Sequence, residues 1–583
     1  MIKALSRSLR QYKKGSVITI VLSLLEVAFE ILIPLCMANV IDEGIDVGNM
    51  SAVWKYGIAL LIFAFFQLVT GMLSAHIAAR TSVGFSANLR QDMYDNVQTF
   101  AFSNIDKFST VSIVTRLTTD VTNIQNAYQM LIRMAIRGPV MLVFSMIVSF
   151  RINNTIACIF LAVIPLMAAL LLLIIKNVNP IFNRVFHTYD QLNNVVQENV
   201  RGIRVVKSFN REEYEIDKFK GISNKIYADF AKGERLLAFN SPIMQFFMYA
   251  CMILISWIGA KAIVASGNNA ALGMTTGDLT ALFSYATQIL MSLMMLSMVF
   301  AMITISIASA RRIAEILEEK TDIANPANPQ MTVQDGSIRF EGVDFVYAAK
   351  ADKKVLDNIN LSIASGETVG IIGGTGSSKS SLVQLIPRLY DVTGGRLTLG
   401  GVDVREYDLD TLRNAVAMVL QKNELFSGTI KENLRWGNEN ATDEEIEYAC
   451  KLACAEEFIQ TFPDKYDTHI EQGGTNVSGG QKQRLCIARA LLKKPKVLIL
   501  DDSTSAVDTK TDASIQKSFA EFIPDTTKII IAQRVSSVQH ADQIIVLDDG
   551  EMVAAGKHEE LLTTCDIYRE VYESQKKGDG KNE

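Results

Sequence analysis

The stretch Thr368-Val369-Gly370-Ile371-Ile372 runs directly into Gly373-Gly374-Thr375-Gly376-Ser377-Ser378-Lys379-Ser380-Ser381. Its first five residues have the composition of a buried strand, and apolar residues at helical spacing follow its end. A strand, a glycine-rich turn and a Lys-Ser pair that opens a helix predict a phosphate-binding loop. Backbone N–H groups and the helix N-terminus surround phosphate oxygens in such a loop. The strict pattern has glycine where this chain has Ser378, but the predicted strand and helix on either side fit the motif.

Two further segments bring chemistry to this loop. Lys379 is expected to reach the β- and γ-phosphates of a nucleotide, and the Ser380 hydroxyl is expected to ligate Mg²⁺. The apolar run 497–500 reads as a parallel strand that ends at Asp501, a further ligand for the same ion. Ser478-Gly479-Gly480-Gln481 opens another helix and forms a second anion site. Two half-sites in one chain suggest that two chains share nucleotides between them.

The composition of the whole chain indicates a membrane protein. Of its 583 residues, 49% are hydrophobic and only 20% are charged, against about 25% charged in soluble domains. The net charge of −5 gives no reason to expect a nucleic-acid partner. The seven cysteines show neither a metal-ligand spacing nor the pattern of a disulfide framework.

Apolar runs that approach or reach the length of a bilayer span lie in the first half of the chain. An alternative merges the third and fourth runs, which only the segment 151–154 separates, and leaves five spans. The basic residues of the N-terminus place it in the cytoplasm, and the nucleotide-binding half must lie there too. Both ends on one side require an even number, so we predict six spans. They are 16–38, 53–75, 132–150, 155–175, 243–265 and 279–304.

The connections between these spans predict long cytoplasmic extensions. Residues 76–131 and 176–242 are charged and helically patterned, whereas 39–52 and 266–277 contain no Lys or Arg and are expected outside. Read as helical hairpins, the two long segments reach about 40 Å into the cytoplasm. The predicted fold is therefore an all-α six-helix transmembrane domain with helical extensions, followed by an α/β P-loop nucleotide-binding domain. The expected parts are the membrane domain at 1–320, a linker at 321–337, the nucleotide-binding domain at 338–574 and a disordered tail at 575–583.

This set of motifs resembles a half-transporter of the ATP-binding-cassette (ABC) exporter family over residues of about 1–575. The resemblance implies that the cofactors are ATP and Mg²⁺. It implies that Tyr347 stacks on adenine and that Gln421 touches Mg²⁺ and faces the membrane domain. It assigns Ser478, Gly480 and Gln481 to a signature that completes the site on a partner's phosphate loop. It also implies roles for Asp501 as the Walker B aspartate, Ser505–Asp508 as the loop between the two nucleotide domains and Glu198–Glu212 as a coupling region.

Two positions depart from the family pattern. Asp502 stands where the family has the Glu that acts as general base, and Gln533 stands at the switch position, where the family has His. Aspartate is one methylene shorter, and a misplacement of about 1 Å can cost about 100-fold in rate. Glutamine carries no proton but can donate a hydrogen bond to the γ-phosphate. We therefore expect a degenerate site that binds ATP and hydrolyses it slowly; the alternative is tolerated drift in a working homodimer.

The resemblance leads to a functional hypothesis. An intact signature beside a degenerate site predicts a heterodimer with a second ABC half-transporter that keeps Glu and His. The expected function is ATP-driven export of hydrophobic and amphipathic small molecules, as in bacterial multidrug efflux. The expected location is the inner (plasma) membrane, with both termini in the cytoplasm. The alternatives are a lipid or peptide exporter of the same architecture and an ATP-gated channel or regulatory subunit.

The membrane half offers two hints about cargo, each with two interpretations. Glu26 and Glu30 lie four residues apart in the first span, where charges are costly. They either line the cavity and bind cationic amphiphiles or pair with another helix. Methionines at helical spacing in the sixth span suit a promiscuous apolar surface, or simply fill space between packed helices. They are Met291, Met294, Met295, Met298 and Met302.

Overall fold

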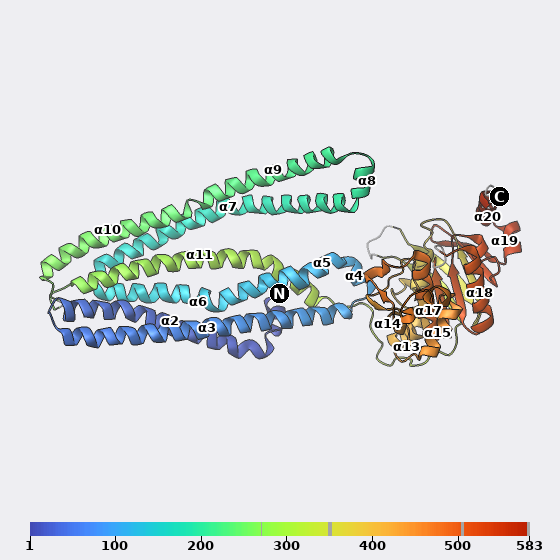
Figure 1. Cartoon of the computed structure of the whole chain (residues 1–583), viewed down its shortest axis with the longest axis horizontal. Coiled ribbons are helices and arrows are strands. Elements are labelled where there is room, and N and C mark those ends of the chain that lie inside the picture. Colours follow the sequence, from blue (N-terminus) through green and yellow to red (C-terminus); the bar gives the residue numbers. More distant parts are fainter. Residues whose placement is uncertain (270, 348–352, 503–506, 580–583) are drawn as a thin grey trace. The chain divides into compact units, whose positions relative to one another are not determined.

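A computed structural model describes residues 1–269, 271–347, 353–502 and 507–579 (Figure 1). Contacts between residues divide the chain into two units. The first unit consists of Met1–Gln98 and Thr110–Glu319, and the second of Thr99–Ser109 and Lys320–Glu583. The short segment Thr99–Ser109 therefore belongs with the nucleotide-binding half, although in sequence it lies between the two parts of the first unit.

The secondary structure of the first unit consists of helices joined by short loops in its described residues. Its six longest apolar stretches are long enough to cross a membrane, which confirms the predicted number of spans. The helices that contain them are α2 (Lys13–Asn39), α3 (Met50–Gln98), α6 (Val121–Ile152), α7 (Asn154–Arg201), α10 (Asn240–Ser266) and α11 (Thr276–Glu318). The other helices are α1 (Ile2–Arg7), α5 (Thr110–Thr115), α8 (Ile203–Ser208) and α9 (Glu212–Leu237), with shorter turns at Arg10–Tyr12, Val40–Ile45 and Arg116–Asp120.

A single residue separates the third span from the fourth. Asn153 has an extended backbone, and its side chain accepts hydrogen bonds from the backbone N–H groups of Thr155 (3.0 Å) and Ile156 (3.1 Å). This cap ends α6 and begins α7, because it satisfies donors that a continuous helix would pair internally. The five-span alternative is therefore wrong.

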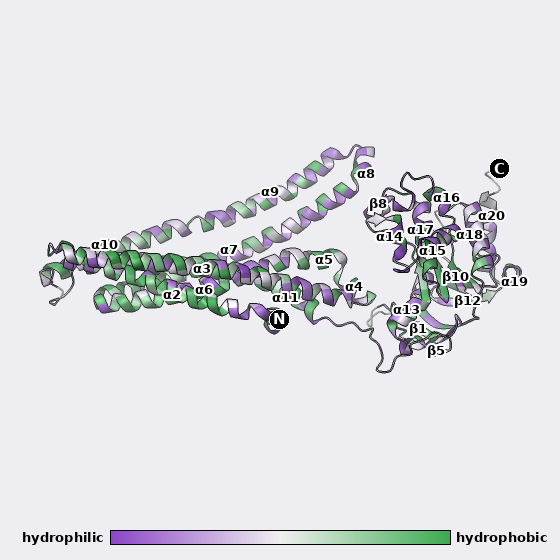
Figure 2. Cartoon of the chain, turned by 60° about the horizontal axis from the view of Figure 1, so that its bottom comes forward, coloured by the Kyte–Doolittle hydropathy of each residue, from purple (hydrophilic) through white to green (hydrophobic). Residues whose placement is uncertain are grey.

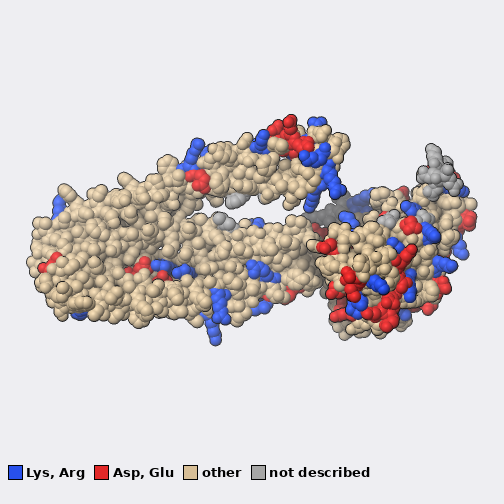
Figure 3. Space-filling model, in the orientation of Figure 1, with Lys and Arg blue, Asp and Glu red and all other residues tan. Residues whose placement is uncertain are grey.

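Several helices are much longer than a membrane is thick. The helices α3 and α7 contain 49 and 48 residues, or about 70 Å at 1.5 Å per residue, against about 30 Å of hydrocarbon. Figure 2 shows α7 and α9 turning from apolar to polar toward α8, which joins them. On the face shown in Figure 3, much of the first unit carries few charged side chains. The helical extensions are therefore the polar continuations of apolar spans.

An ion-paired cluster lies among the spans of the first unit. Arg137 on α6 donates to Glu26 Oε1 at 2.9 Å and to Glu30 Oε2 at 2.7 Å, both on α2. Glu26 is buried against Gly71 on α3, where an added Cβ would lie 3.0 Å from its Oε1 atom. The interpretation that the two glutamates pair with another helix is therefore the one that the structure supports. Neutralisation by Arg137 lowers the cost of holding the carboxylates in the membrane.

Replacement of Arg137 by methionine is expected to destabilise the membrane unit by about 3 kcal/mol, because it leaves two carboxylates without their cation. The measurement is unfolding in mixed micelles by titration with a denaturing detergent. Adding Glu26→Gln and Glu30→Gln to Arg137→Met should recover most of the loss. The control is Arg133→Met, since Arg133 has no ion-pair partner among the residues that the structure describes. Equal losses from both arginines would contradict the role of the cluster.

The second unit is built around a six-stranded sheet with the order β12-β11-β3-β10-β9-β6. The strands β11, β3, β10, β9 and β6 are parallel, and β12 is an antiparallel edge. A four-stranded antiparallel sheet has the order β2-β1-β4-β5, and β7 pairs with β8. The strand bounds are β1 Ile338–Phe345, β2 Leu356–Ile363, β3 Thr368–Ile372, β4 Gly394–Leu399, β5 Val402–Asp403, β6 Val416–Val419, β7 Gly428–Thr429, β8 His469–Ile470, β9 Val497–Asp501, β10 Thr527–Ile531, β11 Gln543–Asp548 and β12 Glu551–Gly556.

Helices cover the large sheet, and hydrophobic cores form on both of its faces. In β9, Leu498 and Leu500 contribute to one core, and Val497 and Ile499 contribute to the other, as the two-residue period of a strand requires. This arrangement confirms the predicted α/β fold of the nucleotide-binding half. The helices are α4 (Phe102–Phe108), α12 (Lys379–Gln384), α13 (Leu409–Ala415), α14 (Ile430–Arg435), α15 (Asp443–Leu452), α16 (Glu456–Ile459), α17 (Gly479–Leu492), α18 (Thr509–Phe522), α19 (His558–Thr564) and α20 (Asp566–Asp579), with shorter turns at Val404–Glu406, Lys465–Asp467, Gln472–Gly474 and Val535–Ser537.

The C-terminal end of the chain corrects one expectation. Residues 575–583 were expected to be disordered, but α20 continues to Asp579, and 580–583 lie outside the described residues. The helix persists because its apolar face packs on the core, with Tyr568 fully buried and Val571 against the same cluster. The polar composition of the tail concealed this amphipathic pattern.

Candidate nucleotide-binding site

The sheet register places the predicted site residues at one edge. Ile531 of β10 pairs with Ile371 of β3 on one side and with Asp501 of β9 on the other. The segments that follow these parallel strands therefore leave the sheet side by side. In open α/β sheets, this carboxyl edge is where ligands bind.

The loop after β3 has the backbone geometry of a phosphate cradle. A Cβ atom at Gly373 would lie 2.1 Å from the carbonyl oxygen of Leu547, so only glycine fits there. Gly376 has a φ of +88°, and Ser378 has a φ of +69° immediately before α12 begins at Lys379. Ser378 occupies the glycine position of the strict motif in a left-handed conformation, which costs about 1–2 kcal/mol for a residue with a side chain.

Lys379 lies within this loop. Its Nζ atom donates to the carbonyl oxygens of Gly373 (2.9 Å) and Gly374 (2.8 Å) and to Ser377 Oγ (3.2 Å). Burial lowers the pKa of Lys379, and the nearby carboxylates of Asp501 and Asp502 oppose that shift. The two loop carbonyls and the Ser377 hydroxyl thus hold the ammonium group within the predicted phosphate loop, which also contains Thr375 and Ser381.

Ser380 and Asp501 form the predicted metal-binding pair. The Ser380 hydroxyl donates to Asp501 Oδ1 at 3.0 Å. Burial raises the pKa of the Asp501 carboxyl, and the Ser380 hydrogen bond opposes this shift. A hydroxyl and a carboxylate oxygen in contact are the hard ligands that Mg²⁺ takes beside phosphate oxygens. The donor set therefore fits Mg²⁺.

Asp502 is contacted by two of the glutamines that the sequence singled out, Gln421 and Gln533. Its Oδ2 atom accepts a hydrogen bond from Gln533 Nε2 at 2.9 Å and from Gln421 Nε2 at 3.3 Å. Asp502 is buried and has a φ of +48°, so its backbone is also left-handed. The residues of the two departures from the family pattern are therefore direct neighbours, and one hydrogen bond joins them.

The signature residues stand apart from this group. Ser478 caps α17: its Oγ accepts from the Gln481 N–H at 3.3 Å, and its own N–H donates to Gln481 Oε1 at 2.9 Å. Gly480 lies in the first turn of α17. Within the described part of the chain, no hydrogen bond joins these three residues to the phosphate loop. Of the predicted loop Ser505–Asp508, residues 505 and 506 lie outside the described residues, and Asp508 caps α18.

Tyr347 lies beside the end of the phosphate loop. Its hydroxyl is 2.8 Å from Ser381 Oγ, and 48% of its side chain is exposed. An exposed aromatic ring at this position can stack on a flat base. The predicted adenine contact and the phosphate loop are therefore joined by a hydrogen bond.

Sequence reasoning missed one residue that contacts residues 533–535, which contain the switch position and are called the switch segment below. Gln575 on α20 accepts a hydrogen bond from Val535 N–H at 2.9 Å and donates one to the carbonyl oxygen of Gln533 at 2.7 Å. One side-chain amide thus holds the backbone on both sides of Arg534. The spacing of Tyr568, Val571 and Tyr572 is the signal that would have extended the helix to this residue.

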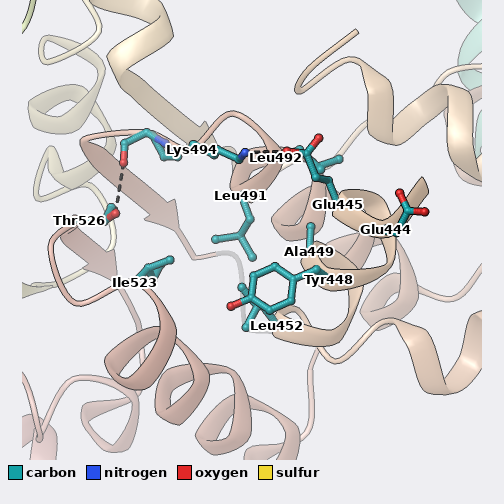
Figure 4. Close-up of a pocket in the computed structure, with 11 residues that line it drawn as sticks. Glu444, Glu445, Tyr448, Ala449, Leu452, Leu491, Leu492, Lys494, Ile523 and Thr526 are labelled. Carbon is teal, nitrogen blue, oxygen red and sulfur yellow. Dashed lines mark hydrogen bonds and ion pairs between the residues drawn. The ribbon is translucent and has the colours of Figure 1, made fainter. Parts of the chain in front are cut away.

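The second unit also contains a cavity that none of the predicted residues lines. It has a volume of about 440 Å³, and its apolar walls come from Tyr448, Leu452, Leu491 and Ile523 (Figure 4). At its rim, Lys494 pairs with Glu445 at 2.6 Å. The cavity lies among α15, α17 and α18 and is separate from the nucleotide residues.

The sequence and the fold both match known proteins. Residues 16–294 match the ABC transporter transmembrane region, and residues 356–505 match the ABC transporter ATP-binding family. The chain is 37% identical over 578 residues to the uncharacterized ABC transporter ATP-binding protein YfiB of Bacillus subtilis, covering 99% of this chain and 98% of that protein. The chain belongs to the ABC transporter family.

Two further matches are a relative of known activity and a solved structure with the same fold. The chain is 32% identical to the ATP-dependent lipid A-core flippase of Desulfotalea psychrophila, over 86% of each chain. Its fold is that of a bacterial Atm1-family ABC exporter with ATP bound, with a TM-score of 0.82 and 23% identity over 97% of this chain and 99% of that chain. The protein is therefore a multi-pass membrane protein and an ATPase-coupled transporter, with the transmembrane and ATP-binding parts fused in one chain.

Replacement of Gln575 by alanine is expected to loosen the switch segment, because it removes two hydrogen bonds worth about 1 kcal/mol each. Hydrogen exchange at the Val535 amide should become roughly 10-fold faster in the full chain, since a loss of about 1.4 kcal/mol corresponds to one factor of ten. Exchange measured by mass spectrometry on peptides that cover 533–535 checks this result. The control is Lys576→Ala, the next residue on the same helix. Unchanged exchange in Gln575→Ala would contradict the bracing role.

Proposed function

We propose that this chain is one half of a heterodimeric ABC exporter of hydrophobic and amphipathic compounds. In this proposal, its own phosphate loop and Walker B residues form the degenerate ATP site. The observation that carries the proposal is the hydrogen bond from Gln533 Nε2 to Asp502 Oδ2 at 2.9 Å. A heterodimer follows because the other half must then supply the efficient hydrolytic site.

The Gln533–Asp502 hydrogen bond affects the step in which water attacks the γ-phosphate. A general base must accept a proton from that water, and its carboxylate must reach it. The Asp502 carboxylate oxygen is instead engaged by amide donors, and its side chain is one methylene short of the usual glutamate. Gln533 cannot accept or carry the proton. Lys379, Ser380 and Asp501 remain suited to holding ATP and Mg²⁺, so binding is retained while hydrolysis is slow.

The signature is the part of this chain that serves the other site. Ser478 and Gly480 lie at the N-terminus of α17, where free N–H groups and the helix dipole favour an anion. This end of α17 makes no hydrogen bond with the described residues of the chain's own phosphate loop. In the proposed dimer it meets the γ-phosphate held on the partner, whose Glu and His are intact.

The proposed location is the bacterial plasma membrane, the inner membrane where there are two, with both termini in the cytoplasm. The basic N-terminal segment and the cation-free outer loops favour this orientation. ATP is supplied from the cytoplasm, so the nucleotide-binding unit must face it.

An exposed methionine surface supports apolar cargo. On α11, Met291, Met294 and Met298 are 53%, 41% and 62% exposed. These three side chains are therefore available to contact apolar molecules, whereas Met295 and Met302 are half-buried and can fill space between helices. Flexible thioether side chains suit a surface that binds apolar molecules of different shapes.

The similarity to a lipid A-core flippase supports a second candidate, export of an amphipathic lipid across the same surface.

Hydrolysis in the heterodimer is expected to be asymmetric. Replacing the partner's catalytic Glu by Gln should reduce ATP turnover by about 100-fold or more, because it removes the efficient general base. Asp502→Asn in this chain should reduce turnover far less. The measurement is phosphate release by the purified complex.

A variant of this chain that is designed to regain hydrolysis gives a sharper test of the degenerate site. In a complex whose partner lacks its catalytic Glu, Asp502→Glu with Gln533→His should raise turnover, because it restores a base and a proton carrier to this chain's site. The matched control adds Lys379→Ala, which should abolish the gain. Equal losses from the two single changes, or high turnover by this chain alone, would show that its site is not degenerate.

We expect the complex to transport its cargo only when ATP is present. Inverted vesicles that contain the complex should accumulate a cationic amphiphilic dye on addition of ATP, and a partner Glu→Gln complex should not. A parallel assay with a fluorescent phospholipid tests the lipid alternative. Movement of an ion down its gradient on ATP addition, without accumulation of either probe, would instead indicate a channel.

A further inference from the structure

The segment Thr99–Ser109 is anchored in the nucleotide-binding unit by several side chains. Ser103 Oγ on α4 donates to Asp322 Oδ1 at 3.0 Å, and Asn104 Nδ2 donates to the carbonyl oxygen of Lys320 at 3.2 Å. Asn104 is buried. This segment lies in sequence between the long helix α3 and the short helix α5, which precedes α6, so α4 is joined by the chain to two of the spans.

One tyrosine lies between α4 and the predicted adenine site. The Tyr390 hydroxyl donates to Asp106 Oδ2 at 2.8 Å, and its ring centre is 6.0 Å from that of Phe102, also on α4. Burial and the Asp106 carboxylate raise the pKa of Tyr390, so the phenol remains a donor. On its other side, the Tyr390 ring meets Tyr347 at 5.1 Å with an interplanar angle of 85°.

The contacts continue from Tyr347 into the phosphate loop. The Tyr347 hydroxyl is 2.8 Å from Ser381 Oγ, two residues beyond Lys379. Phe345 packs on both tyrosines, at 4.8 Å from Tyr347 and 5.6 Å from Tyr390. A tilt of Tyr347 toward Tyr390 would therefore displace the Tyr390 ring, because Phe345 packs on both tyrosines.

We propose that Tyr390 is a positioning residue that couples adenine bound on Tyr347 to α4 through its hydrogen bond with Asp106. The proposal rests on the proposed function in one respect, the assignment of Tyr347 to the adenine site. Adenine stacking fixes the tilt of Tyr347, the near-perpendicular contact fixes Tyr390, and the Tyr390 hydroxyl fixes Asp106. The phosphates act through the loop itself, so the coupling through Tyr390 depends on the base.

Reciprocity makes this coupling measurable in binding. If adenine stabilises the Tyr390–Asp106 contact, then the contact must stabilise bound adenine by the same factor. A change at Asp106, which is not among the predicted nucleotide residues, should therefore lower the affinity for ATP. It should not change the affinity for inorganic tripolyphosphate with Mg²⁺, a ligand that has no base.

The experiment is calorimetric titration of the full chain in nanodiscs with ATP and with tripolyphosphate. Tyr390→Phe and Asp106→Ala should each weaken the affinity for ATP by about 3-fold, within the range measured for coupling residues, and should leave the affinity for tripolyphosphate unchanged. The double variant should be no weaker than either single variant, because both remove the same hydrogen bond. The matched control is Ser103→Ala, which removes a different contact of the same helix and should change neither ligand.

Three results would overturn the proposal. They are an unchanged ratio of ATP to tripolyphosphate affinity in both variants, losses that add in the double variant, and an equal loss in Ser103→Ala. Phosphate release by the heterodimer tests the degenerate site separately. ATP binding that does not depend on Tyr390 is compatible with a degenerate site, and equal hydrolysis at both sites is compatible with coupling through Tyr390. Failure of one idea is therefore distinguishable from failure of the other.

Discussion

The pairing of β10 between β3 and β9 is the constraint on which the nucleotide site depends. Ile531 lies opposite both Ile371 and Asp501. The loops that follow β3, β9 and β10 therefore leave the sheet at one edge, although they are far apart in the sequence. These strand ends bring different groups together: Lys379 follows β3, Asp501 ends β9 and Asp502 follows it, and Gln533 follows β10. A shift of one residue in this register would turn Asp501 toward the opposite face of the sheet.

Sequence patterns predicted the parts of this protein that depend on local composition. Six apolar runs, the glycine-rich loop and the apolar strand before Asp501 are visible without a structure, because each is a continuous segment with its own signature. The contacts of Gln575 were not predictable in this way. A glutamine in a polar tail carries no signal of its partner, and only the fold brings α20 against the switch segment.

The same limit applies to side chains in the membrane half. The positions of Glu26 and Glu30 in the first span were evident, but two interpretations stayed open because their partner lies on a different helix. That partner is Arg137 on α6. Its pairing with both glutamates explains how all three charges persist among apolar residues, since each would be costly alone.

The assignment of Thr99–Ser109 to the nucleotide-binding unit has a consequence for how such chains can be recombined. A chimaera joined within the linker at 321–337 would exchange the nucleotide-binding half but leave α4 behind. Asp106 would then face a foreign residue at the position of Tyr390, and a junction before Asp322 would also replace the partner of Ser103. The module that can be exchanged intact is therefore discontinuous in sequence, and a working hybrid must transplant α4 together with everything beyond the linker.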